Sequence, residues 1–200
     1  MNLQESIELI KSFSNKELAL ATEVDSSRSA ELEQQKSIQF PPELKAYIDT
    51  VCPLQGLDIE SVGHPVELLS RAETAWEMQG YNVNPATKAL IPGWNESWFL
   101  IATEGGDPII VDLSENNESS IVYSAMRGAG AWEFCPIADS ISQFLLCALA
   151  VEHALNFPGI KEPLDEDFNL VGEAARWLFP FLKQHAEEYY DEWASVFENY

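Results

Sequence analysis

The sequence predicts an α+β protein, in which a mixed, mainly antiparallel β-sheet with a central meander is wrapped by N- and C-terminal helices. Between residues 98 and 138, four short runs rich in Val, Ile, Tyr, Phe and Trp alternate with turn residues, which is typical of a β-meander. Segments with helical spacing of apolar residues lie on both sides of these runs. Hydrophobic residues make up 46% of the 200 residues, so we expect a packed core and no wholesale disorder.

The N-terminal part is expected to begin with a helix. Leu3, Ile7 and Ile10 share one helical face, which predicts an amphipathic helix over residues 2–13. Residues 14–37 are rich in Ser, Glu and Gln, and they predict either a weak helix or a mobile linker.

The next segment combines a second helix, a short strand and a long loop. The sequence FPPELKAYIDTV (residues 40–51) predicts a helix that begins near the proline pair and buries an apolar stripe of Leu44, Tyr47, Ile48 and Val51. Alternation over residues 57–62 indicates a strand, and we expect a short helix to begin near Pro65. Residues 77–97 contain several glycines and prolines and are expected to form a loop.

Within the meander, the sequence IATEGGDPIIVDLS (residues 101–114) raises the question of what its glycine pair does. A phosphate loop would need a following Lys-Ser/Thr pair and a helix, and a calcium loop would need more oxygen ligands at alternate positions. Neither pattern is present. Gly105-Gly106 is therefore predicted to be a hairpin turn between strands at about 98–104 and 108–113, with no bound phosphate or metal.

Helices are expected to close the chain. Residues 139–155 predict a helix with Asp139 or Ser140 as its N-cap, and residues 170–200 predict further helix that Pro180 kinks or divides. The C-terminal part carries an apolar stripe that we expect to pack on the domain or on a second copy of it: Leu178, Leu182, Tyr189, Trp193 and Phe197.

The predicted domain organisation has three parts. Residues 1–37 form an N-terminal helix and linker, residues 38–155 form the α+β domain, and residues 156–200 form a C-terminal helical extension packed on the domain.

The charge of the chain constrains its partners. Asp and Glu number 33 and Lys and Arg number 11, for a formal net charge of −22. Such a protein repels nucleic acid and anionic lipid, and it attracts a basic protein. Acidity that serves solubility alone is the alternative interpretation. No apolar run reaches the roughly 18 residues of a membrane span, and the N-terminus lacks the features of a signal peptide, so a cytoplasmic protein is predicted.

No residue pattern predicts covalent chemistry. The three cysteines are widely spaced without a CxxC pair and are expected to be small core residues: Cys52, Cys135 and Cys147. The three histidines lie far apart in the sequence: His64, His153 and His185. A GxSxG nucleophile motif is absent from the sequence. We therefore predict a protein that is not an enzyme, with no catalytic residue, metal ligand or cofactor.

The ordered segments of the middle of the chain resemble the SUKH superfamily, which includes the Smi/Knr-type proteins. The similarity rests on Ile101 to Asp107, on the strands that follow, on Ile137 to Leu145 and, upstream, on FPPELKAYIDTV, and it covers roughly residues 38–150. Residues 52–56, which follow the helix predicted at residues 40–51, and the loop of residues 77–97 depart from the family pattern. The resemblance implies an α+β domain. It also implies that the chain is similar to bacterial immunity proteins, which bind toxins that are often nucleases. The family has no shared catalytic residues, so the resemblance implies none for this chain.

Charge and resemblance together predict a non-catalytic binding protein that neutralises a basic toxin domain. A regulatory or scaffold protein of the same fold, and a small-ligand-binding protein or enzyme, remain as alternatives, and a homodimer is left open. The loops of the sheet carry the residues expected to bind the partner, with the tryptophan as an anchor: Trp94, Glu96, Glu104, Asp107, Glu115 and Glu118.

Overall fold

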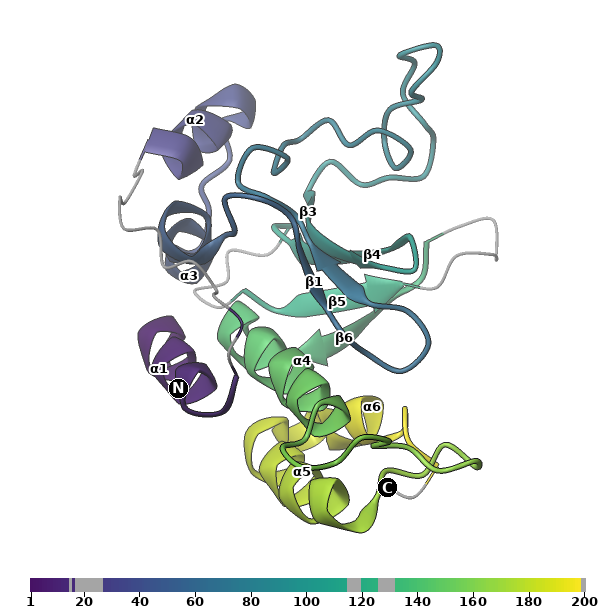
Figure 1. Cartoon of the computed structure of the whole chain (residues 1–200). Coiled ribbons are helices and arrows are strands. Elements are labelled where there is room, and N and C mark those ends of the chain that lie inside the picture. Colours follow the sequence, from purple (N-terminus) through teal and green to yellow (C-terminus); the bar gives the residue numbers. More distant parts are fainter. Residues whose placement is uncertain (15, 17–26, 115–119, 126–131, 199–200) are drawn as a thin grey trace.

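The protein contains one six-stranded antiparallel sheet whose strands follow the order of the sequence (Figure 1). The computed structural model describes residues 1–14, 16, 27–114, 120–125 and 132–198. Its strands are β1 (Leu57–Ile59), β2 (Val66–Leu68), β3 (Trp98–Glu104), β4 (Asp107–Asp112), β5 (Val122–Ala125) and β6 (Phe134–Ala138). Each strand pairs antiparallel with the next. The α+β prediction is confirmed, and the described strand pairs are antiparallel throughout.

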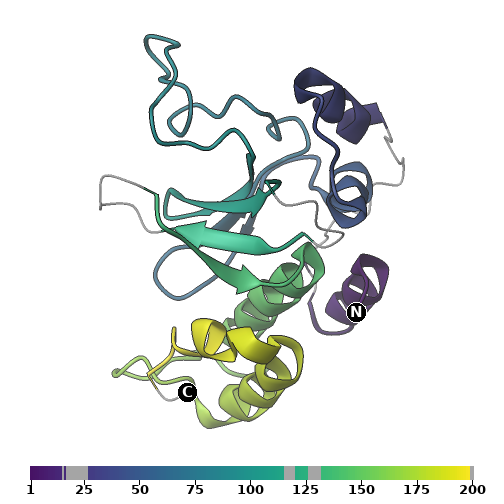
Figure 2. The same cartoon turned by 180° about the vertical axis from the view of Figure 1, so that it is seen from behind.

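Helices lie on one side of this sheet and beyond its lower end (Figures 1 and 2). They are α1 (Leu3–Phe13), α2 (Ser27–Lys36), α3 (Pro42–Ala46), α4 (Ile141–Leu155), α5 (Gly172–His185) and α6 (Tyr190–Ala194). A π-helical turn at Tyr47–Val51 extends α3, and a short 3-10 helix at Glu187–Tyr189 precedes α6. Within the described residues, no helix is both long and apolar enough to cross a membrane.

Helix α4 forms the centre of the packing. Thirteen of its 15 residues are buried, because the sheet, α1 and α5 all lie against it. Its first turn is held from two directions. The hydroxyl of Ser140 accepts a hydrogen bond from Gln143 N at 3.0 Å, as an N-cap does. The carboxylate of Glu43 on α3 accepts hydrogen bonds from the backbone N–H groups of Ile141 and Ser142 at 3.2 and 2.9 Å.

The opposite face of the sheet is covered by aromatic side chains. Because neighbouring residues of a strand face opposite ways, Leu100 and Ile110 point away from the core that Phe99 and Val111 enter, yet both are buried. Five rings contact one another on this face and form what we call the aromatic cap: Tyr81, Trp94, Trp98, Trp132 and Phe134. The long segment between β2 and β3 supplies two of these rings, Tyr81 and Trp94.

The β3–β4 hairpin confirms the predicted turn. Gly105 and Gly106 have φ angles of +56° and +87°, which an L-residue with a side chain rarely adopts. Glu104 lies opposite Asp107 in the register, so the glycine pair forms the whole connection. The strand bounds differ from the prediction by one residue at each end of β4.

The short helix expected near Pro65 is wrong, because this segment forms strand β2. Val66 and Leu68 are buried and Glu67 is exposed, and β2 pairs with β1 on one side and β3 on the other. Gly63, at φ +94°, lies in the turn that reverses the chain before it. Three alternating residues are too few to distinguish a strand from one helical turn, and only the ladder with β3 decides the outcome.

At the C-terminus, three residues of the expected apolar stripe are buried against the rest of the chain, and Tyr189 and Trp193 are half-buried. Leu178, Leu182 and Phe197 have no exposed surface, and the indole N–H of Trp193 donates to the carbonyl of Ile137 at 2.9 Å. This bond ties α6 to β6, an outer strand of the sheet. Pro180 lies inside α5, and the second segment begins at Glu187 instead.

Removing the carboxylate that holds the first turn of α4 should destabilise the whole fold. In Glu43→Ala, two N–H groups and the Ser142 hydroxyl lose their acceptor in a half-buried place, so we expect unfolding to require about 1–2 kcal/mol less. Urea denaturation followed by tryptophan fluorescence measures this difference. Glu162→Ala, which removes an exposed loop carboxylate, is the control and should change stability by less than about 0.5 kcal/mol. Equal effects of the two substitutions would contradict the capping role.

Candidate functional site

Two of the predicted partner-binding residues lie together at the end of the β3–β4 hairpin. Glu104 and Asp107 face each other in register, and the ring of His64 lies so close to Gly105 that an added Cβ would come within 2.8 Å of it. Burial raises the pKa of the Glu104 carboxyl, the nearby Asp107 raises it further, and His64 opposes both. The hairpin therefore presents two acidic groups beside a histidine.

The predicted anchor, Trp94, belongs to the aromatic cap and is half-buried. Its indole N–H donates to the carbonyl of Trp98 at 3.3 Å, and its ring centroid lies 5.8 Å from that of Tyr81. The Tyr81 hydroxyl donates to the carbonyl of Gly106 at 2.9 Å, so Tyr81 connects the tryptophan to the hairpin. Glu96 is exposed in the loop before β3.

The other two predicted acids, Glu115 and Glu118, lie outside the described residues. The register therefore places Glu104 and Asp107 together, on the face of the sheet that also carries Val66. Trp94 lies in the aromatic cap on the opposite face, and Tyr81 connects this cap to the hairpin at the carbonyl of Gly106.

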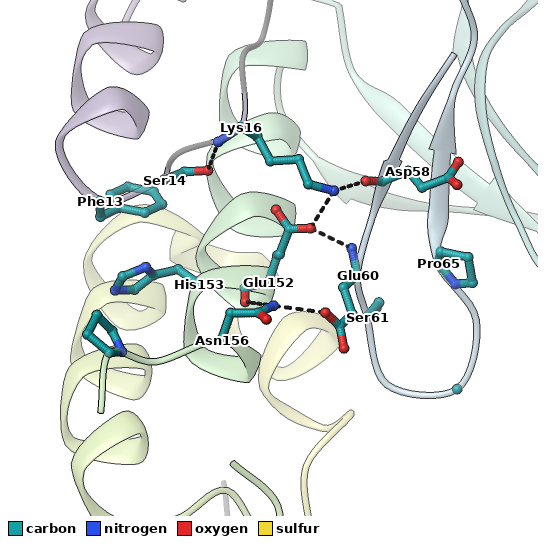
Figure 3. Close-up of a pocket in the computed structure, with 12 residues that line it drawn as sticks. Phe13, Ser14, Lys16, Asp58, Glu60, Ser61, Pro65, Glu152, His153 and Asn156 are labelled. Carbon is teal, nitrogen blue, oxygen red and sulfur yellow. Dashed lines mark hydrogen bonds and ion pairs between the residues drawn. The ribbon is translucent and has the colours of Figure 1, made fainter. Parts of the chain in front are cut away.

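A polar groove that the sequence did not predict lies beside β1 (Figure 3). Its volume is about 840 Å³. The β1–β2 loop forms one wall, the end of α4 forms the floor, and the segment after α1 forms the other wall. The residues that define its chemistry are Phe13, Lys16, Asp58, Glu60, Glu152 and His153.

A buried ion pair lies at the base of this groove. The Nζ atom of Lys16 is 2.7 Å from the Oε1 atom of Glu152, whose side chain is only 8% exposed. Lys16 also donates to the backbone carbonyl of Asp58, and the backbone N–H of Glu60 donates to Glu152 at 3.0 Å (Figure 3). Asn156 donates to the Glu60 carboxylate at 2.8 Å. The ion pair thus joins α4 and the segment after α1 to the outer strand β1.

Aromatic rings line the side of the groove next to α1. The ring of His153 lies 5.5 Å from Phe13 and 4.6 Å from Trp177, measured between centroids. Burial lowers the pKa of His153, and a hydrogen bond with the Phe13 backbone opposes this shift. This wall offers apolar contact next to the carboxylates.

The groove and the hairpin share the β1–β2 loop. Gly63 and Pro65 line the groove, whereas His64 between them lies against Gly105. The acidic groups of the groove and those of the hairpin therefore lie on either side of the β1–β2 loop. Sequence reasoning missed the groove because its residues come from three segments that lie far apart in the sequence. The one available signal was Glu152, an acid within the otherwise apolar run LLCALAVEHAL.

Two of the three thiols, those of Cys52 and Cys147, are buried. Burial raises the pKa of Cys52 to about 12 and raises that of Cys147 further, so both thiols are protonated at neutral pH. The prediction that Cys135 lies in the core is wrong, because this residue is exposed on the outer strand β6, which no further strand covers. Among the described residues, no group of three His, Cys, Asp or Glu side chains is placed to hold a metal ion.

Protonation of His153 should weaken the fold at mildly acidic pH. Its pKa in the folded protein lies below the unfolded value of about 6.5, so the unfolded chain binds the proton more readily. Stability is then fully present above that value and falls as the pH decreases towards the folded pKa. His153→Phe should lose less unfolding free energy between pH 7.5 and 5.5 than the unaltered protein. Urea denaturation at the two pH values tests this, and an equal loss in both proteins would exclude the role.

A family model described as the SMI1 / KNR4 family (SUKH-1) matches residues 23–147. Comparison with curated proteins and with solved structures finds no significant match. The matched region contains the whole sheet and the hairpin acids, whereas Lys16 and Glu152 lie outside it. Because the match covers more than half of the 200 residues, and the structure has the α+β architecture that the resemblance implied, this chain belongs to the SMI1/KNR4 (SUKH-1) family.

Proposed function

We propose that this protein is a non-catalytic binding protein that neutralises a basic toxin domain, as an immunity protein does. Membership of the SMI1/KNR4 family is the observation that carries the proposal, because the family as a whole has an immunity-protein-like role. The toxin is a protein with a positively charged face, and a nuclease is the class that fits best because its substrate is a polyanion. The protein acts by covering that face.

The charge of the chain supports this role. A net charge of −22 over 200 residues creates a negative field that accelerates encounter with a basic surface. The same field keeps nucleic acid and anionic membranes away, so a basic protein remains the favoured partner in the cytoplasm.

The binding face that we propose centres on the β3–β4 hairpin and the adjoining loops. Glu104 and Asp107 contribute charge, and we propose that Trp94, which Tyr81 connects to the hairpin from the other face of the sheet, contributes apolar area. Glu96, Glu115 and Glu118 are proposed to extend this face. Loops at the end of a sheet can change in sequence without disturbing the core, as a protein matched to one partner requires.

The described chemistry supports binding without catalysis. The two buried thiols are protonated, and the most buried carboxylate, Glu152, is occupied by a lysine and a backbone N–H. Neither group is available as a nucleophile or a general base.

A regulatory or scaffold role is the alternative within the same family. The two functions differ in the partner: an immunity protein binds a toxin and abolishes its activity, whereas a scaffold leaves its partner active. Affinity capture from the native host, followed by co-expression of the captured protein, distinguishes them. Rescue of growth supports immunity, and binding without rescue supports the scaffold.

Charge reversal at the hairpin should slow association with the partner. We expect Glu104→Lys with Asp107→Lys to reduce the association rate by about tenfold at low salt, because these acids lie where the basic surface docks. The rate for the unaltered protein should also fall steeply between about 10 and 150 mM ionic strength. Stopped-flow fluorescence measures both effects.

The matched control carries the same change in charge at another place. Glu187→Lys with Glu188→Lys alters two exposed acids at the start of the segment that leads to α6. This double variant should reduce the rate by less than about twofold, and both variants should keep the melting temperature of the unaltered protein. If the two double variants slow association equally, the binding face lies elsewhere. Turnover of a substrate that disappears on changing one carboxylate would refute the binding role itself.

A further inference from the structure

Among the described residues, two side chains close the outer edge of β1 in place of a strand. Lys16 donates to the carbonyl of Asp58, and Glu152 accepts from the N–H of Glu60. A carbonyl and the N–H two residues later are the two groups to which one residue of a parallel neighbouring strand would bond. The ion pair therefore occupies the place of one strand residue, with Lys16 as its donor and Glu152 as its acceptor (Figure 3).

The carboxylate of Glu152 requires a cation at this position. Glu152 lies on the largely apolar α4 and is 6% exposed, and a buried carboxylate without a partner is costly. Lys16, in contrast, has a side chain that is 33% exposed and comes from a segment outside the sheet. The cation is therefore essential, but nothing requires that Lys16 supply it.

The groove around the ion pair favours a second cation over an anion. Asp58 and Glu60 line it together with Glu152, against Lys16 and the largely neutral His153. Phe13 and His153 provide the apolar wall that the aliphatic part of a long basic side chain covers well. The acidic groups of the groove and its apolar wall thus both favour a long basic side chain as the ligand.

We propose that this groove recognises an arginine on an extended segment of the basic partner, and that this arginine replaces Lys16 at Glu152. The guanidinium makes two parallel hydrogen bonds to a carboxylate, which an ammonium group cannot do. The partner's backbone then bonds to Asp58 and Glu60 and adds a strand to β1. Until the partner binds, Lys16 of the same chain pairs with Glu152 and keeps the edge of β1 closed. The inference rests on the proposed function, since it specifies how the same basic partner is recognised.

A synthetic peptide tests the groove without the partner. The probe is acetyl-Thr-Val-Arg-Val-Thr-amide, titrated into the ¹⁵N-labelled full chain at low salt and followed by amide chemical shifts. We expect the shifts to concentrate at Glu60 and Ser61. In Lys16→Ala, the internal competitor is absent, so the peptide should bind about fivefold more tightly. Lys11→Ala is the matched control, because it removes one exposed lysine from the N-terminal part and should leave the affinity unchanged.

Two further changes test the arginine–carboxylate pair itself. A peptide with citrulline in place of arginine keeps the shape without the charge, and it should lose most of its affinity. Glu152→Gln keeps an acceptor for the Glu60 N–H but removes the charge, so it should weaken the arginine peptide about tenfold. Melting curves show whether each variant is folded.

The proposal is overturned if Lys16→Ala binds the peptide no more tightly than Lys11→Ala, or if the citrulline peptide binds equally well. It is also overturned if the shifts appear at the hairpin acids and not at Glu60. These outcomes are separate from those of the partner experiment. A toxin that binds through the hairpin alone would support the proposed function and refute the binding of arginine in the groove. Peptide binding in the absence of any toxin partner would support the binding of arginine in the groove and refute the proposed function.

Discussion

The burial of α4 on all sides is the constraint on which the rest of the structure depends. The sheet lies against one side of this helix, α1 against another and α5 against a third, so removing any of them exposes apolar surface. A helix surrounded in this way has no solvated face for a charged residue. Glu152 is the one acid on it, and its burial forces a cation and a backbone N–H towards it. The groove beside β1 is thus a consequence of the packing of the core.

Sequence patterns predicted the elements whose signals are local and long. The helix at residues 141–155 has a full apolar face and an N-cap, and the β3–β4 hairpin has a glycine pair between two strand-like runs, so both were predictable. Strand β2 was not, because three alternating residues become a strand only through pairing with β3. The exposure of Cys135 depends on its position in an outer strand, which its aromatic neighbours in the sequence do not reveal. The ion pair of Lys16 and Glu152 joins residues 136 positions apart, and no spacing rule detects such a contact.

The family match covers only part of the groove. The matched region supplies the sheet, the hairpin and the outer strand β1, whereas α1, α5 and the end of α4 lie outside it. The wall of the groove therefore combines a strand shared with the family and side chains from the surrounding helices, including the aromatic wall at His153. Under the proposed binding mode, the family scaffold is kept while the segments outside the matched region set what the groove recognises.

The two outer strands of the sheet are closed by different means, which limits how copies of this protein can associate. In β6, Pro136 has no N–H to offer and the carbonyl of Ile137 is already bonded to Trp193. In β1, the closure is a single ion pair. Growth of a fibre by strand addition needs two open edges on every subunit, and a strand added at β6 would meet no N–H at Pro136 and an occupied carbonyl at Ile137. These two features of β6 disfavour a chain of copies even where the proposed partner opens β1.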